Sequence, residues 1–353
     1  MYRSLSSCVV CALLLINAEW GHADGASTVH PPAERGVALG LYEKNPDGSY
    51  LELLKEIKAL GATHVSIVHP WYMETALSDG IFEHPVETTP WSSLVRAVQD
   101  AKCVGLEVFL FPILRVADQT HGWRGTLKPK SVERFFENYT KLMLRFAHLA
   151  EKMKLPLLSV GSELASMEVH EAKWRTLIAK IREVYSGKLV YSSNWDNYRR
   201  TPFVDALDYA GVTGYFELAE EHTSPSVEEL IHAWRYIYFD LLRWSHRVKK
   251  PLLITEVGYL SQADAAAWPW KEGAREAVDV SIQRKCYEAF RRAWDNEARL
   301  EGVYWWQWFG EGGMDDYEYT PRRKPAAEEI AKWYRSVESA GAAEETTVGA
   351  EGK

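Results

Sequence analysis

The chain has 353 residues, of which 46% are hydrophobic and 25% charged, with a formal net charge of −8. This length can bury a sizeable core. The acidic balance, without a stripe of Lys and Arg, excludes nucleic acid as an expected partner. Fifteen Trp and eighteen Tyr are more than most chains carry. Core packing accounts for most of them, and a surplus indicates flat surfaces on which the apolar faces of sugar rings rest.

Residues 1–23 are predicted to be a secretory signal peptide, because a positive charge, an apolar run and small residues follow one another in the order typical of such peptides. Arg3 precedes an apolar run over 8–16, and small and polar residues follow through Ala23. The run is shorter than the roughly 20 residues that span a bilayer. We therefore expect an exported protein, periplasmic or extracellular, without a membrane span, cut after Ala23 or Ala18.

The four cysteines predict neither a disulfide nor a metal site. Cys8 and Cys11 belong to the signal peptide, whereas Cys103 and Cys286 fall in expected helices. These two helices follow the second and seventh expected strands, so their Cα atoms should lie beyond the roughly 7 Å limit for a disulfide. No Cys-x-x-Cys spacing remains after cleavage and no His-Glu-x-x-His pattern occurs, so no metal and no cofactor are expected.

From residue 36 onward, eight short apolar runs rich in β-forming residues alternate with helical patterns. Apolar residues at 4-3-4-3 spacing mark two of the helices, over 135–149 and 230–244. This alternation predicts the α/β class and a single closed (β/α)8 TIM barrel. The runs cover 37–41, 65–69, 108–113, 157–161, 189–193, 210–215, 252–255 and 303–308.

The domain is expected to span 24–337, with no linker dividing it. The helical pattern after the fifth strand is short, so that unit is the weakest of the eight. Gly61 and Gly105 follow two helical segments, where a helix C-cap favours a left-handed residue. The tail over 338–353 has no apolar stripe and is predicted to be disordered.

Two glutamates end expected strands of this barrel. The fourth strand ends in VGSEL with Glu163, and the seventh ends in LLITEVGY with Glu256. Active sites of such barrels lie at the C-terminal ends of the strands. A carboxylate there is costly to bury without a purpose or a partner. Each glutamate alone could instead cap a helix or pair with a buried Arg.

The pair is more informative than either residue. Strands 4 and 7 are three steps apart in a ring of eight, which places their axes roughly 14 Å apart across the mouth. The side chains reach inward and leave a gap of very roughly 5–9 Å between the carboxyl groups. Glycoside hydrolysis needs such a pair, one carboxylic acid and one carboxylate. The range covers both retaining and inverting geometries, so spacing alone leaves the stereochemistry open.

Spaced blocks along the chain resemble glycoside hydrolase family 113, known for endo-β-1,4-mannanases. This family belongs to the clan of retaining glycosidases with glutamates after strands 4 and 7. The blocks run in order through most of the mature length, which makes the match specific. They are WRGTLKP (123–129), FAHLAEKMKLPLLSVGSEL (146–164), WRTLI (174–178), GKLVYSSNWD (187–196), DALDYAGVTGYF (205–216), PLLITEVGY (251–259), GVYWWQW (302–308) and RKPAAEEIAKWY (323–334).

The resemblance implies a retaining hydrolase of a β-linked polysaccharide. Glu163 matches the acid/base and Glu256 the nucleophile, and Tyr215 matches the tyrosine that hydrogen-bonds the nucleophile. An acid must be protonated near neutral pH, so we expect the pKa of Glu163 to lie above that of Glu256.

Six further residues at strand ends are predicted to bind substrate. By resemblance, Asn194 and Trp195 contact sugar and Trp306 forms the platform under the scissile sugar. Strand alternation puts Trp308 on the face of Trp306, and Trp305 on the opposite face against the helices. The complete set is Trp71, Arg115, Asn194, Trp195, Trp306 and Trp308.

Two positions depart from the family pattern. Ser162 stands where the family tends to have Thr and the wider clan has Asn. In the clan, that Asn holds the 2-hydroxyl of the substrate. The third strand ends FPILR, with Arg115 in place of a Lys-Pro-His-like segment. Two alternatives therefore stay open, a glycosidase that trims another exported polysaccharide and a catalytically silent glycan-binding barrel. A serine esterase is excluded because no GxSxG elbow occurs. We expect a monomer whose partner is a polysaccharide or oligosaccharide.

Overall fold

The computed structural model describes residues 30–336 except 43–48, 119–121 and 274–275. The predicted signal peptide and the predicted disordered tail lie outside the described residues.

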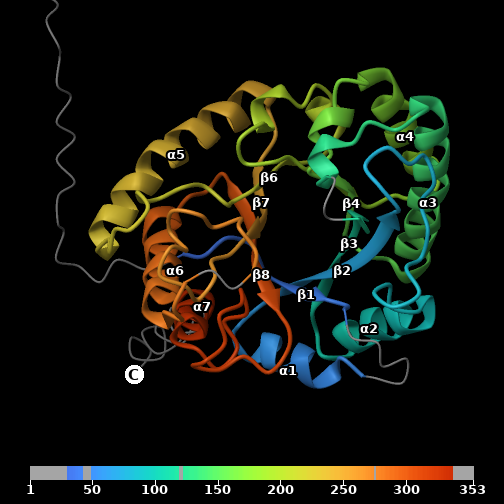
Figure 1. Cartoon of the computed structure of the whole chain (residues 1–353). Helices are drawn as coiled ribbons and strands as arrows, with labels where there is room; N and C mark the ends of the chain where they lie inside the picture. The colour runs from blue at the N-terminus through green and yellow to red at the C-terminus, as the bar shows by residue number, and fades with distance from the viewer. Residues whose placement is uncertain (1–29, 43–48, 119–121, 274–275, 337–353) are drawn as a thin grey trace, which may run out of the picture.

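Eight parallel strands form one sheet that is wound into a barrel (Figure 1). Their order is β5-β4-β3-β2-β1-β8-β7-β6. The two ends of this order meet at a parallel bridge between Ser193 and Val212, where the Thr213 amide donates to the Ser193 carbonyl over 2.9 Å. The strands are β1 (Glu34–Gly40), β2 (His64–Met73), β3 (Glu107–Val116), β4 (Leu157–Ser162), β5 (Lys188–Ser192), β6 (Ala210–Thr213), β7 (Leu252–Val257) and β8 (Leu300–Trp308).

Each of the eight predicted apolar runs coincides with one of these strands, so the predicted (β/α)8 TIM barrel is confirmed. β2 and β3 continue beyond the predicted runs, to Met73 and Val116, and stay paired in an unbroken register. This extension carries both strands to the C-terminal mouth of the barrel.

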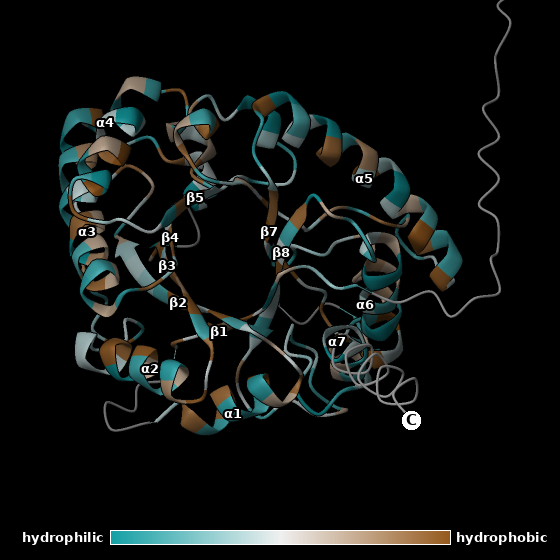
Figure 2. Cartoon of the chain, turned by 180° about the vertical axis from the view of Figure 1, so that it is seen from behind, coloured by the Kyte–Doolittle hydropathy of each residue, from teal (hydrophilic) through white to brown (hydrophobic). Residues whose placement is uncertain are grey.

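Helices surround the strands and bury their apolar faces against them (Figure 2). No α-helix follows β5; two short 3-10 turns, η4 (Tyr198–Arg200) and η5 (Val204–Ala206), stand in its place, as the weak pattern predicted. The helices in the described part of the chain are α1 (Leu51–Ala59), α2 (Trp91–Cys103), α3 (Val132–Met153), α4 (Glu171–Arg182), α5 (Val227–Val248), α6 (Val280–Trp294) and α7 (Pro325–Tyr334).

The helix ends follow from local sequence. Ser131 is the N-cap of α3, and its hydroxyl accepts from the Arg134 amide. Ser226 is the N-cap of α5 and forms a capping box, in which its hydroxyl accepts from the Glu229 amide and the Glu229 side chain accepts from the Ser226 amide. Gly61 has φ of +88° just after α1, which is the left-handed conformation expected of a glycine that ends a helix.

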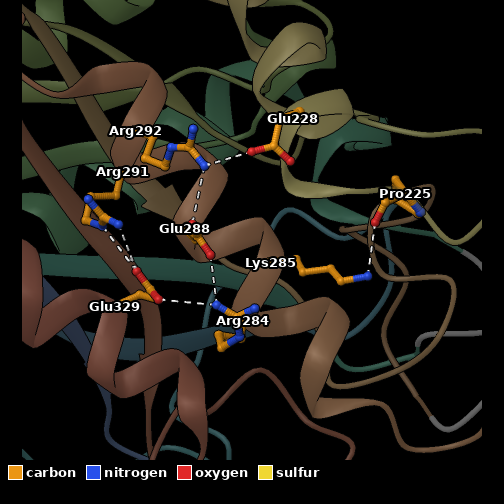
Figure 3. A network of polar contacts seen from close by, with 8 residues as sticks. All are labelled: Pro225, Glu228, Arg284, Lys285, Glu288, Arg291, Arg292 and Glu329. Carbon is orange, nitrogen blue, oxygen red and sulfur yellow. Dashed lines mark hydrogen bonds and ion pairs between the residues drawn. The ribbon is translucent and has the colours of Figure 1, made fainter.

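Charged side chains join α5, α6 and α7 on the outside of the barrel (Figure 3). Arg292 of α6 pairs with Glu228 of α5 at 3.2 Å, and Arg284 pairs with Glu288 at 2.8 Å. Arg291 reaches Glu329 of α7 at 3.1 Å, with both side chains largely buried. Exposed pairs contribute about 0–1 kcal/mol each. The exposed pairs therefore connect neighbouring helices but add little to the stability of the fold.

The two cysteines of the described chain are free, as predicted. Cys103 is exposed at the end of α2, and Cys286 is buried in α6. Among the residues with described structure, no helix combines the length and the apolar character needed to cross a bilayer.

Candidate active site

Glu163 and Glu256 both lie at the C-terminal mouth of the barrel. Glu163 comes directly after β4 and is 5% exposed, and Glu256 lies near the end of β7 and is 1% exposed. Glu163 has φ of 54°, a left-handed conformation that is uncommon outside glycine. Its amide donates to the Ser192 carbonyl of β5 over 2.8 Å. The turn that follows β4 therefore begins at Glu163.

Glu256 is held by two hydroxyl groups. Tyr215, just beyond β6, donates to Oε2 over 3.0 Å, and Ser162, the last residue of β4, donates to Oε1 over 3.1 Å. The predicted contact of Tyr215 with this carboxylate is therefore present. Ser162, which departs from the family pattern, is a second donor to the same group.

Glu163 is paired with Arg124, a residue that sequence analysis did not single out. Arg124 lies in the 3-10 turn η2 (Arg124–Thr126) after β3, and its Nη2 donates to Glu163 Oε2 over 2.6 Å. The two side chains are 16% and 6% exposed. Arg124 Nε is buried and has no hydrogen-bond partner among the described residues. The bond is charge-assisted and lies in a setting from which most water is excluded.

The two carboxyl groups affect each other electrostatically. Burial, and then the charge of Glu163, raise the pKa of Glu256 to about 8, whereas Arg124, Tyr215 and Ser162 lower it. The two like charges oppose each other in this buried setting, which is one cause of the raised pKa of Glu256. The order of the two pKa values expected from sequence stays a prediction.

Arg115 faces the inside of the barrel, as its predicted role requires. Phe109 of β3 packs against Tyr304 of β8 across the barrel, and Phe111 packs against Phe109. Arg115 shares their face through strand alternation and ends this row at the mouth.

Tyr42, just after β1, is affected electrostatically by Arg115, Arg124 and Glu256. Burial raises the pKa of Tyr42 to about 12, Arg115 and Arg124 lower it, and Glu256 and Glu272 raise it. The charges of both signs therefore act on one phenol. Tyr42 and Glu272 lie outside the strands, so no strand-end pattern in the sequence pointed to them.

Asn194 and Trp195 follow β5 at the same end of the barrel. Asn194 is 6% exposed and donates from Nδ2 to Asp196 over 2.7 Å. The half-buried Trp195 ring stacks on Trp270, from the loop after β7, with centroids 5.0 Å apart. Trp268 meets the Trp270 ring edge to face at 5.4 Å. Three indoles therefore form a cluster next to the segment that follows β5.

The three tryptophans of β8 point in different directions. Trp305 stacks on Tyr287 of α6 at 4.2 Å, so it packs against the helices as predicted. Trp306 is 7% exposed and shares the inward face of Tyr304 by alternation.

Trp308 does not share that inward face, in contrast to the prediction. Its Nε1 donates over 2.9 Å to Glu56 of α1, which also binds Arg322. A buried indole N–H needs such a partner, and here a helix supplies it. The structure therefore brings Trp306, but not Trp308, to the inside of the barrel.

Trp71 also lies away from the pair. Its indole donates to His69 Nδ1 over 3.1 Å, its ring meets Phe146 of α3, and Arg145 lies 5.0 Å from the ring centroid. It is 5% exposed. These contacts place Trp71 between β2 and the helices, because odd residues of β2 face outward. The prediction of substrate contact overlooked this alternation.

No group of three or more His, Cys, Asp or Glu side chains in the described ranges is arranged to hold a metal ion. The chemistry available at the mouth is that of two carboxyl groups with arginine, tyrosine and serine donors.

Comparison with protein families gives a match to the sequence model of Glycoside Hydrolase Family 113 over residues 40–320. The chain belongs to this family. It is therefore a glycoside hydrolase, which acts on O-glycosyl bonds, and the predicted family is confirmed. A comparison with curated proteins found no match.

Solved structures of the same family have the same fold. A family 113 β-mannanase from Alicyclobacillus acidocaldarius, in complex with ManMIm, is 25% identical with a TM-score of 0.76, covering 87% of this chain and 98% of that one. A family 113 β-1,4-mannanase complex is 22% identical with a TM-score of 0.77, covering 86% and 99%. A GH5_18 protein from Bifidobacterium longum, at 13% identity, has a TM-score of 0.58 over 86% and 78%. The last two similarities show the fold alone.

Proposed function

We propose that the protein is a retaining endo-β-1,4-mannanase in which Glu163 is the acid/base and Glu256 the nucleophile. The observation that carries this proposal is the convergence of two buried carboxyl groups at the barrel mouth. Each has its own partners, Arg124 on Glu163, and Tyr215 with Ser162 on Glu256. The 25% identity to a family 113 β-mannanase supports mannan as the substrate class.

In the first step, the Glu256 carboxylate attacks the anomeric carbon from one face of the sugar. Glu163 gives its proton to the glycosidic oxygen, the bond to the leaving sugar breaks, and a glycosyl ester forms on Glu256. The hydroxyl donors Tyr215 and Ser162 stabilise Glu256 as the carboxylate before it attacks.

In the second step, Glu163 removes a proton from water as the water attacks the anomeric carbon. The ester bond breaks and Glu256 leaves as a carboxylate. The negative charge beside Glu163 is absent while the ester exists, so Glu163 is then a carboxylate that can act as a base. Two displacements on opposite faces retain the anomeric configuration.

The first step requires the proton on Glu163, whose Oε2 accepts from Arg124 Nη2. We propose that the arriving glycosidic oxygen takes the place of Arg124 Nη2 at Glu163 Oε2. The released guanidinium, whose Nε has no partner among the described residues, binds sugar hydroxyls instead.

Further contacts come from the residues that face the site. Trp306 serves as the platform under the scissile sugar, and Arg115, Asn194 and Trp195 bind neighbouring hydroxyls or rings. We propose export through the predicted signal peptide and action as a monomer on a polysaccharide outside the cytoplasm.

Product analysis tests this proposal. The purified protein is incubated with β-1,4-mannan, mannohexaose, glucomannan and a panel of other β-glycans, and the first anomer formed is read by NMR. Manno-oligosaccharides that appear first as the β anomer are expected. Activity on another glycan with no product from any mannan would move the substrate to a different exported polysaccharide. An α anomer formed first would overturn the retaining mechanism.

A further inference from the structure

Another buried glutamate, Glu168, lies close to Glu163 in the chain. Glu168 is five residues after Glu163, directly after the 3-10 turn η3 (Ala165–Met167), and is 2% exposed. Its Oε1 accepts from the Tyr191 hydroxyl over 2.9 Å. Its Oε2 accepts from Asn197 Nδ2 over 2.9 Å and from the Thr201 hydroxyl over 3.3 Å. The catalytic steps described above make no use of it.

Tyr191 connects this carboxylate to the backbone of the acid/base. Its hydroxyl donates to Glu168 and accepts from the Leu164 amide over 2.8 Å. Leu164 is the residue immediately after Glu163, whose own amide is bonded to the Ser192 carbonyl. The backbone amides of Glu163 and Leu164 are thus both hydrogen-bonded to residues of β5.

The turn needs this support because Glu163 is left-handed, with φ of 54°. Such a conformation costs about 1–3 kcal/mol for a residue with a side chain and persists only where its surroundings hold it. A loose turn would let the carboxyl group swing away from the glycosidic oxygen.

The chemistry of Glu168 matches its surroundings. A carboxylate only accepts hydrogen bonds, and the groups of Tyr191, Asn197 and Thr201 that meet it are all able to donate. Because the Tyr191 proton is committed to Glu168, a lone pair of the tyrosine oxygen stays directed at the Leu164 amide. A glutamine at 168 keeps one acceptor oxygen but turns its NH2 group toward at least one of these donors, so it cannot accept from all three as the carboxylate does.

Glu168 also connects the acid/base to the substrate-binding segment after β5. Asn197 and Thr201 belong to this segment, and the Asn194 carbonyl accepts from the amides of Asn197 and Tyr198, over 2.9 Å each. One carboxylate thus fixes the turn that carries the proton donor and the loop that carries a predicted sugar contact.

We propose that Glu168 is a positioning residue for the reaction, which acts through Tyr191 to hold Glu163 at the glycosidic oxygen. The inference rests on the proposed role of Glu163 as acid/base. It assigns Glu168 no contact with substrate.

The test is Glu168→Gln measured on aryl β-glycosides of the sugar that the enzyme cuts, mannose expected, with leaving groups from dinitrophenol to phenol. A misplaced acid harms substrates whose leaving group needs a proton. We expect kcat/KM to fall by about 10-fold or more for the phenyl glycoside and by less than about 3-fold for the dinitrophenyl glycoside. A fall of the same size for every leaving group, or no fall, would overturn the proposal.

Two tyrosine variants control for a merely structural effect. Tyr191→Phe should reproduce the leaving-group dependence, and the double variant should be no worse than either single one, because both act through one link. Tyr139→Phe removes a similar buried hydroxyl, bonded over 3.0 Å to the Val160 carbonyl, and should leave the dependence unchanged. If Glu168→Gln does not fold, Tyr191→Phe alone tests the proposal. A Tyr191→Phe protein without the leaving-group dependence of kcat/KM then overturns it.

Glu163→Ala on the same glycosides separates this inference from the proposed function. If Glu163→Ala shows no leaving-group dependence, the role of Glu163 is wrong and the positioning role falls with it. If Glu163→Ala shows the leaving-group dependence and Tyr191→Phe does not, only the positioning role of Glu168 is wrong.

Discussion

Arg124 donates from Nη2 to Glu163 Oε2 over 2.6 Å, so the proposed acid is paired with a cation. Arg124 also acts on Glu256, whose pKa it lowers against the effects of burial and of Glu163. One guanidinium therefore acts on both glutamates.

Arg124→Gln should move the activity profile to higher pH. Arg124 lowers the pKa of Glu256, so without the cation Glu256 ionises less readily and the acidic limb of the pH profile of kcat/KM should shift upward by about one unit or more. Arg124→Lys keeps the charge and should shift the profile much less. Steady-state kinetics between pH 4 and 9 would measure this, and coincident profiles for wild type and Arg124→Gln would contradict the pairing.

The barrel and its two glutamates could be predicted because their signals are local. An apolar run such as 252–255 marks a strand by composition, and the strand end fixes where Glu256 lies. Arg124 and Tyr42 reach the site from loops whose course depends on tertiary packing. The family-like block over 123–129 contained Arg124, but nothing in it indicated which carboxylate the side chain meets.

The errors concern which way a side chain faces. Trp71 lies near the end of β2, and strand alternation puts its ring against α3 rather than toward the inside of the barrel.

Trp306→Ala should damage turnover of glycan more than folding. Its ring faces the inside of the barrel, where the proposed platform meets sugar. Trp305→Ala is the matched control, since Trp305 stacks on Tyr287 and its loss should cost about 3–5 kcal/mol of stability. Urea unfolding and kcat/KM on the glycan would be measured for both. A Trp306→Ala protein that unfolds while its folded fraction keeps normal kinetics would remove the platform role.

Glu168 should make the protein less stable as pH rises. Burial raises its pKa to about 7, although Tyr191, Thr201 and Asn197 lower it. A carboxyl group whose pKa is raised by folding stabilises fully below its unfolded pKa, near 4.3, and this contribution is lost as pH rises through about 7.

The variant Glu168→Gln isolates that contribution, since it has no titrating group at 168. The unfolding free energy of Glu168→Gln minus that of wild type should increase between pH 4.5 and 8, by up to about 3 kcal/mol. Buried His64 and His69, whose pKa values are lowered to about 4, act oppositely in both proteins and cancel in the difference. Urea unfolding at four pH values would measure it, and a flat difference would show that Glu168 ionises as freely as in water.

The division of labour between Glu163 and Glu256 can be tested independently of family resemblance. Loss of an acid/base typically costs about 10²–10⁴-fold, because only proton transfer is lost. Glu163→Ala should therefore still form the glycosyl ester from an activated aryl glycoside. Azide, entering where the side chain was, should speed breakdown of the ester and give a glycosyl azide of retained configuration.

Glu256→Ala removes the covalent step and should be nearly inactive on every substrate. Azide that rescues this variant attacks from the side of the missing nucleophile, so its product must have inverted configuration. NMR of the anomeric proton distinguishes the two azides. Swapped configurations would reverse the assignment of Glu163 and Glu256. Near-normal activity in both variants would remove the two residues from the mechanism, because a carboxylate that forms or releases the ester cannot be replaced by a methyl group without loss.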